Sequence, residues 1–243
     1  MDALSAMWQN LLAWAGAAGA GVAGGGAAGA LGAHAATLDM AQLLALAAAV
    51  GWASGLRLYL VVFVCGLAGT MGWIALPAGL HALQHPAMLA ASGLMLFVEF
   101  FADKIPGVDS LWDMVHSVIR VPAGAALAAG VFGADSATMA ALSGLLGGAL
   151  AATSFATKAS TRAAVNTSPE PFTNIAVSLS EEGVVLGALW LATNYPVAFG
   201  ICLAVTLVLS VWLLMVLIKY LAAVLRRLRG WLGGGGITNP ASS

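Results

Sequence analysis

Long apolar runs separated by short polar segments occupy most of the chain after residue 37. They fall at about 38–53, 55–75, 86–103, 109–132, 137–162, 172–194 and 196–227. Runs close to twenty residues long, without polar alternation, are typical of membrane-spanning helices rather than of the strands of a membrane barrel. The pattern therefore predicts an all-α, polytopic membrane bundle of about six to seven transmembrane helices.

The first two runs meet at the segment Gly51-Trp-Ala-Ser-Gly-Leu-Arg57, and the first run is too short to span unless it is tilted or extended. Two glycines within seven residues favour a tight break over a continuous helix. We expect a hairpin or a broken helix here, which gives three helical hairpins followed by a C-terminal helix. Arg57 is either an ordinary arginine at the cytoplasmic interface or a charge beside a half-helix N-terminus that suits an anion.

Composition supports a membrane protein and suggests how the chain is divided. The chain is 61% hydrophobic and 8% charged, so it has more apolar surface than one soluble core can hide. Residues 1–36 are rich in Ala and Gly and are predicted to be flexible, residues 37–229 form the transmembrane domain, and residues 230–243 form a flexible tail. The partner is the lipid bilayer, nucleic-acid binding is set aside because there is no basic patch with aromatics, and a homo-oligomer stays open.

The distribution of Lys and Arg predicts the orientation, because short cytoplasmic loops hold an excess of both residues. Arg226, Arg227 and Arg229 close the last helix and place the C-terminus in the cytoplasm. Counting helices backwards puts five other basic positions on the same side: Arg57, Lys104, Arg120, Lys158 and Arg162. The intervening loops at 76–85, 133–136 and 194–196 contain no Lys or Arg, so the assignment is consistent at every loop.

The turn of the second hairpin carries the strongest functional signal, since six of the nineteen charges lie between residues 99 and 120. A charge at the bilayer centre costs about 2.5–3.5 kcal/mol, so these side chains must face protein, water or a ligand. Helical spacing places Glu99 and Asp103 on one face of the first helix. It also aligns the charged side chains and the histidine of the returning helix in one continuous stripe. The candidate residues here are Glu99, Asp103, Lys104, Asp109, Asp113, His116 and Arg120.

Three chemical interpretations of this cluster remain open. Carboxylates with an imidazole at these spacings can hold a divalent cation, so the question of a metal is left undecided. The acids and His116 can also relay protons, because closely held like charges push one carboxyl pKa upward. Alternatively, Lys104, Arg120 and Arg57 pair with the acids and only join the helix ends.

The third hairpin carries complementary charges. Lys158 and Arg162 lie on one helix, and Asn174 and Glu181 lie on the next. They form either salt bridges or part of an ion pathway. The chain contains no HExxH, GxSxG, Walker A or dinucleotide motif, so we assign no catalytic residue, no cofactor and no enzymatic activity.

Four polar motifs, GWASGLRLYL at 51–60, EFFADKIPGVDSLWD at 99–113, IRVPAGA at 119–125 and KASTRAAVNTSPEP at 158–171, occur in order. Together they resemble a bacterial membrane family described only as a domain of unknown function. The resemblance covers roughly residues 38–195 and leaves out the N-terminal segment and the last helix. It implies a polytopic protein of the bacterial inner membrane, and it supplies no substrate and no functional residues.

The leading functional hypothesis is a small-solute or ion transporter or channel, in which the charged hairpin turns line a polar cavity open to the cytoplasm and bind a proton or cation. The alternative is a non-catalytic structural or assembly protein whose charged turns are ion-paired. A third possibility, a membrane enzyme acting on lipid headgroups, requires a bound metal.

Overall fold

The computed structural model describes residues 38–105, 107–133, 136–166 and 171–233, and every regular element in these ranges is helical. The elements are α3 (Met40–Thr70), the 3-10 helix η2 (Ala78–Gln84), α4 (Pro86–Ala102), α5 (Val108–Phe132), α6 (Ala137–Val165), α7 (Pro171–Asn194) and α8 (Pro196–Gly233). The predicted all-α bundle is confirmed.

Local sequence signals explain where several helices begin. Asp39 and Gln42 form a capping box at the start of α3, in which each side chain accepts a hydrogen bond from the backbone N–H of the other. Pro86 and Pro196 occupy the first positions of α4 and α8, where a missing N–H leaves no helical hydrogen bond unmade. The turn between α4 and α5 uses Gly107 at φ +88°, a conformation that side chains disfavour.

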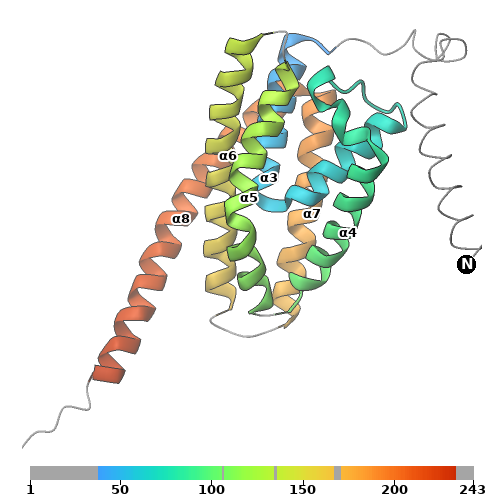
Figure 1. Ribbon diagram of the computed structural model, residues 1–243. Coiled ribbons are helices and arrows are strands. Elements are labelled where there is room, and N and C mark those ends of the chain that lie inside the picture. The colour runs from blue at the N-terminus through green and yellow to red at the C-terminus, as the bar shows by residue number, and fades with distance from the viewer. Residues whose placement is uncertain (1–37, 106, 134–135, 167–170, 234–243) are drawn as a thin grey trace, which may run out of the picture.

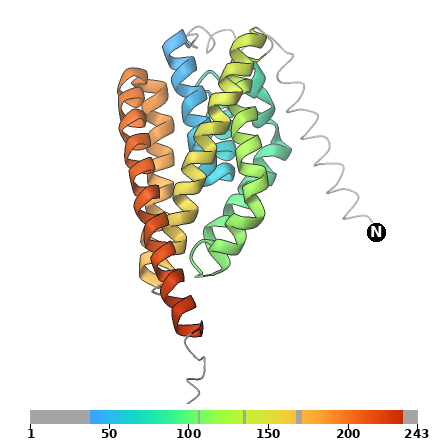
Figure 2. The ribbon, with the colours of Figure 1, turned by 90° about the vertical axis from the view of Figure 1, so that its left-hand side faces the viewer.

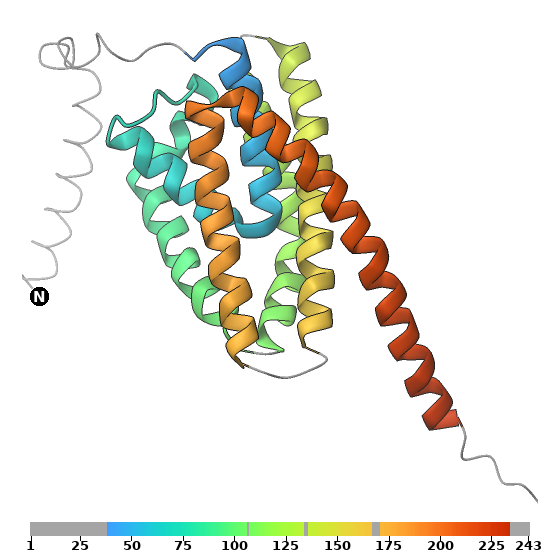
Figure 3. The same cartoon turned by 180° about the vertical axis from the view of Figure 1, so that it is seen from behind.

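Helix α3 reverses its direction at Arg57, where the backbone leaves helical geometry (φ −145°, ψ 75°). The first half descends beside α6, with Gly51 against the backbone of Gly147. The second half returns beside α4, with the Phe63 ring against Gly93. Figures 1 and 3 show the resulting V-shaped hairpin inside the bundle. The break expected between residues 51 and 57 is therefore present.

Both ends of α3 lie at the same end of the bundle, here called the upper end as drawn in Figure 1. Gln42 Nε2 donates a 3.3 Å hydrogen bond to the carbonyl of Thr193, in the last turn of α7. Gly66, in the returning half, packs against Leu83 of η2. The first of the three predicted hairpins is therefore re-entrant. It starts and ends at the upper end, and its turn lies inside the bundle.

The second and third hairpins, α4–α5 and α6–α7, run the full height of the bundle and turn at its lower end (Figure 1). Helix α8 begins at the upper end and extends beyond the lower ends of the other helices (Figures 1 and 2). Within the described ranges, five helices are long and apolar enough to cross a membrane, and η2 with α4 forms a further pair bent by 68°. The three hairpins and C-terminal helix match the expected arrangement.

Polarity is distributed as expected in a lipid environment, with large apolar side chains on the outside. Val118 is 77% exposed, Leu145 75% and Val208 70%, on α5, α6 and α8. The core is built largely by α3, where Ala49, Ala53 and Val61 are fully buried. Together with its membrane-length helices, this surface makes the chain an integral membrane protein.

The predicted chain divisions are only partly within the described residues. The N-terminal segment 1–36 and positions 234–243 of the tail lie outside them. Residues 230–233, which we assigned to the tail, belong to α8.

Four basic residues used to predict the orientation are buried in the bundle. Arg57, Arg120, Lys158 and Arg162 are at most 2% exposed, so their side chains contact protein groups. The exposed basic residues Arg226 and Arg227 remain at the lower end of α8, and Lys104 lies at the turn of the second hairpin.

Candidate functional site

The break in α3 creates the centre of the site, because it exposes backbone groups in the bundle interior that need partners. Lys158 Nζ lies 3.1 Å from the carbonyl oxygen of Leu56, the last residue of the first half-helix. Ser154 Oγ donates a 2.6 Å hydrogen bond to the carbonyl of Trp52. A cation at a helix C-terminus is favoured by the helix dipole, so Lys158 stabilises the broken end.

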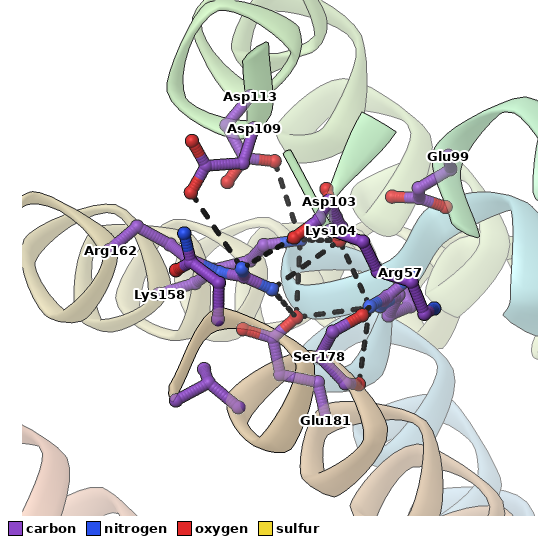
Figure 4. A network of polar contacts seen from close by, with 12 residues as sticks. Arg57, Glu99, Asp103, Lys104, Asp109, Asp113, Lys158, Arg162, Ser178 and Glu181 are labelled. Atoms are coloured by element: carbon purple, nitrogen blue, oxygen red, sulfur yellow. Dashed lines mark hydrogen bonds and ion pairs between the residues drawn. The ribbon is translucent and has the colours of Figure 1, made fainter. Parts of the chain in front are cut away.

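Arg57 at the turn of α3 is fully buried and reaches two other parts of the bundle, the end of α4 and α7. Its Nη2 atom lies 2.9 Å from Asp103 Oδ2, at the end of α4, and 2.6 Å from Ser178 Oγ on α7. Glu181 and Glu182 of α7 complete its ion pairs at 3.4 and 3.5 Å. Acidic side chains at the end of α4 and on α7 therefore hold the turn of α3 in place (Figure 4).

Asp103 is the carboxylate on which the cations converge. Its Oδ2 atom lies 2.9 Å from Arg57, 3.2 Å from Lys158 and 3.6 Å from Arg162. Burial alone would raise the pKa of Asp103, but the positive charges of Lys158, Arg57 and Arg162 outweigh burial and hold the pKa below its ordinary value. Asp103 is therefore ionised at neutral pH.

Lys158 is surrounded by oxygen atoms from four elements. Besides the Leu56 carbonyl and Asp103, its ammonium lies 3.3 Å from both Asp113 Oδ1 on α5 and Glu181 Oε2 on α7. Arg162, one turn later, lies 3.3 Å from the same Glu181 oxygen. The predicted basic and acidic stripes of the third hairpin thus meet, and they meet the charges of the second hairpin as well.

Arg120 holds two carboxylates at once. Its Nη2 atom lies 2.6 Å from Glu99 Oε1, and its Nη1 atom lies 2.6 Å from Asp113 Oδ1. Among the described residues, Arg120 is the sole cation within ion-pair distance of Glu99. Glu99 Oε2 and Asp113 Oδ2 are buried without a hydrogen-bond partner there. Figure 4 shows Glu99 apart from the carboxylates around Lys158 and Arg162.

Hydrogen bonds between amide and carboxylate side chains join the turns of the second and third hairpins. Asn166 Nδ2 donates to both carboxylate oxygens of Asp109 at 3.1 Å, and Asn174 Nδ2 donates to Asn166 Oδ1 at 3.0 Å. Asp109 also accepts hydrogen bonds from the backbone of Gly107 and Ser110. Asp109 therefore acts mainly as a cap and a link between turns.

Two of the predicted residues stand apart from these ion pairs. Lys104 Nζ donates to the Phe100 carbonyl and lies 2.9 Å from the centroid of the Phe100 ring. His116 Nδ1 donates a 2.9 Å hydrogen bond to the Trp112 carbonyl, and the imidazole stacks on the Trp112 ring with centroids 4.0 Å apart. Within the described ranges, His116 makes no ion pair with the acids.

The buried ion network is defined here by its charged members, which are Arg57, Glu99, Asp103, Asp109, Asp113, Arg120, Lys158, Arg162, Glu181 and Glu182. It contains six carboxylates and four cations. Five carboxylate side chains are at most 9% exposed, and the sixth, Glu182, is 21% exposed. With all groups ionised, the network has an excess of negative charge in the bundle interior.

Two cavities lie in the upper part of the described bundle, and no member of the network lines either. One, of about 320 Å³, lies between the second half of α3, α4 and α5. The other, of about 330 Å³, lies between α3 and α7. The expected polar cavity open to the cytoplasm is neither of these, and the charges pair directly with one another.

The divalent-cation interpretation loses its geometric basis. Among the described residues, no three His, Cys, Asp or Glu side chains are placed to share a metal ion. The network cations occupy the positions between the carboxylates.

Ser178 and Asn166 bind network members but were not among the predicted site residues. Ser178 lies four residues after Asn174 and three before Glu181, so helical spacing was an available signal. Asn166 follows the last residue of α6, and its contacts with Asp109 and Ser110 come from another hairpin, which spacing along the chain does not reveal.

Comparisons with known proteins show the family of the chain and leave its activity open. No curated protein and no solved structure matches the chain. One family model matches residues 44–216, so the similarity begins later than we predicted and continues into α8. Because this match covers most of the chain and all of the buried ion network, the protein belongs to the family described as a domain of unknown function, DUF4126.

Proposed function

We propose that this chain is a proton-coupled transporter of the bacterial inner membrane, in which the buried ion network takes up and releases a proton. The observation that carries the proposal is the excess of carboxylates over cations in the buried ion network, which holds six carboxylates and four cations. An uncompensated charge in a low-dielectric site is costly, and such sites usually neutralise by binding a proton.

Glu99 is the proposed proton-binding residue. It shares Arg120 with Asp113, so a single guanidinium faces two carboxylates. Its second oxygen, Oε2, has no hydrogen-bond partner among the described residues. A proton on Glu99 leaves Asp113 ionised and still paired with both Arg120 and Lys158.

The re-entrant α3 supports a transport role over simple anchoring. Broken helices with charged partners near the membrane interior are a recurrent construction of transporter sites. Ion pairs buried in this way contribute little net stability compared with apolar packing, so a purely structural role gains little from them. Movement of the α3 turn past Lys158 and Glu181 is the proposed route by which the network opens.

Proton titration of the purified protein in nanodiscs tests the proton-binding step. We expect the wild type to bind about one more proton than Glu99→Gln over the whole titration. Asp39→Asn, which alters an exposed capping carboxylate, serves as the matched control and should keep that proton. Equal proton binding by wild type and Glu99→Gln contradicts the assignment.

Proteoliposomes carrying an internal pH dye test transport itself. An imposed membrane potential should drive proton movement in the wild type, and the double variant Asp103→Asn, Asp113→Asn should abolish it while the helical content stays intact. Unchanged flux of protons, divalent cations and small anions in this folded variant rejects the transporter.

The direct pairing of every network cation favours one other function, a structural or assembly protein of the membrane. That function predicts that exchanging a pair, as Asp113→Arg with Arg120→Asp, restores the melting temperature lost in each single variant. It also predicts no proton movement in wild-type proteoliposomes.

A further inference from the structure

The cavity between α3, α4 and α5 is apolar and lies directly above the Glu99–Arg120 pair. Its lining includes Tyr59, Met88, Ser92, Met95 and Ala123. Its volume of about 320 Å³ is at the lower limit of small-molecule pockets. Water finds few partners on such a surface, so the cavity suits an apolar occupant.

Helical spacing connects this cavity to the buried ion pair. On α4, Ser92 and Met95 line the cavity, and Glu99 continues the same face one turn further down. On α5, Ala123 lines the cavity, and Arg120 precedes it by three residues on the same face. The Glu99–Arg120 pair therefore lies below the cavity lining, on the same faces of α4 and α5.

The charge balance indicates which ligand suits this position. The buried ion network has more carboxylates than cations, and Glu99 Oε2 is buried without a hydrogen-bond partner among the described residues. A positive charge placed there offsets part of the excess, as a proton does, whereas an anion adds to it. Unbranched methionine side chains, such as Met88 and Met95, adapt to apolar bodies of different shape.

We infer that this cavity binds a lipophilic cation, whose apolar body lies between α3, α4 and α5 and whose positive charge lies at Glu99, where it competes with the proton. The inference rests on the proposed function and adds its substrate class. Mutually exclusive binding of a cation and a proton to one carboxylate makes the predicted transport an exchange when the cation is present. Without the cation, the proton moves alone.

Tetraphenylphosphonium is a suitable probe, because it combines a delocalised positive charge with an apolar surface. The experiment measures its binding to the full-length protein in nanodiscs by equilibrium dialysis, and the protons released in a weakly buffered solution. We expect saturable binding and the release of close to one proton per bound cation. At pH values where Glu99 is mostly protonated, the affinity for the cation should fall about tenfold for each unit by which the pH is lowered. Tetraphenylborate, of similar shape and opposite charge, should not bind at this site.

Three variants separate the site from general partitioning into the lipid. Glu99→Gln should lose proton release and most of the affinity. Ala91→Leu fills the cavity and should weaken binding at least tenfold, whereas Ala90→Leu, on the exposed neighbouring position, should bind as the wild type does. Binding that is non-saturable, equal for both probes or unaffected by Ala91→Leu indicates lipid or acyl-chain occupancy and overturns the inference.

The two proposals fail in different ways. If the Glu99-dependent proton is present in the titration without probe but tetraphenylphosphonium does not bind, the ligand class is wrong and the proton site stands. If the proton itself is missing, the proposed function is rejected whatever the probe does.

Discussion

At the scale of single residues, the network is organised by how many cations each carboxylate contacts. Asp103 contacts three cations, whereas Glu99 and Asp113 share Arg120 and only Asp113 has Lys158 as a second partner. The difference distinguishes Asp103, which three cations hold in its ionised form, from Glu99, for which we propose proton binding. It also makes Arg120 the residue on which the burial of Glu99 depends.

Replacing Arg120 with Met should therefore destabilise the protein strongly. It leaves Glu99 with no cation partner among the described residues, and removing one partner of a buried pair costs about 3–5 kcal/mol. Thermal unfolding in detergent, followed by circular dichroism, measures the loss. Lys104→Met removes a cation outside the network and should change the melting temperature little, so equal losses in both variants contradict this view of Arg120.

Asp103 should determine part of the acid sensitivity of the fold. Its pKa is lower in the folded protein than its ordinary value of 3.8, since burial, which raises it, is outweighed by the positive charges of Lys158, Arg57 and Arg162. Its ionised form therefore contributes stability above the unfolded pKa, and this stability is lost as the pH falls through the folded pKa. Melting temperatures measured down to about pH 3 should fall for the wild type and be flatter for Asp103→Asn. Parallel curves would show that other acids dominate.

At the scale of elements, α3 is the unusual component, because a helix of membrane-spanning length turns back in the interior. Non-helical backbone at membrane depth is tolerated only where protein or water satisfies its polar groups. Lys158 and Ser154 of α6 supply partners for the Leu56 and Trp52 carbonyls. The break in α3 therefore requires that α3 and α6 lie close together, because side chains of α6 bind the carbonyl groups at the break.

Glycine makes that approach possible, and adding one methyl group should disrupt it. A Cβ atom at Gly51 would lie 2.6 Å from Gly147 Cα, so Gly51→Ala forces the two backbones apart. We expect a loss of about 1–3 kcal/mol in unfolding free energy, measured by denaturant titration in mixed micelles. The control Gly183→Ala, on α7 with open space around it, should be neutral or stabilising by up to about 1 kcal/mol. A neutral Gly51→Ala would refute tight packing between these helices.

At the scale of the whole molecule, charge is segregated in a way that defines two ends and an interior. The network occupies the interior and lower part of the bundle, apolar side chains face outward, and exposed Arg226 and Arg227 lie beyond the lower end on α8. Exposed basic residues at the membrane boundary are typical of the cytoplasmic side, so we predict that the lower end faces the cytoplasm.

Cysteine labelling in intact cells checks this orientation. In a background with Cys65→Ala and Cys202→Ala, a membrane-impermeant maleimide should reach Ala82→Cys in η2 from outside. Lys104→Cys, at the opposite end, should react only after the cells are opened. The reverse pattern would invert the topology and place the C-terminus outside.

The sequence by itself determined the fold class, the broken first hairpin and the identity of most network members. The length of an apolar run predicts a membrane helix because the bilayer has a set thickness. Paired glycines predict a break because they lower the free energy needed to leave helical geometry. Helical spacing also placed Glu99 with Asp103 and aligned Asp113 with Arg120. These signals are local, so they can be read from neighbouring positions.

The tertiary structure alone decided where those charges lie and which of them meet. Arg57 and Lys158, which counting assigned to the cytoplasmic boundary, are buried in the bundle, where the turn of α3 meets α6. Arg57 reaches Asp103 and Glu181 from distant segments, and the apolar cavity is assembled from three helices. Such contacts depend on how helices pack around one another, and spacing along a single helix carries no information about them.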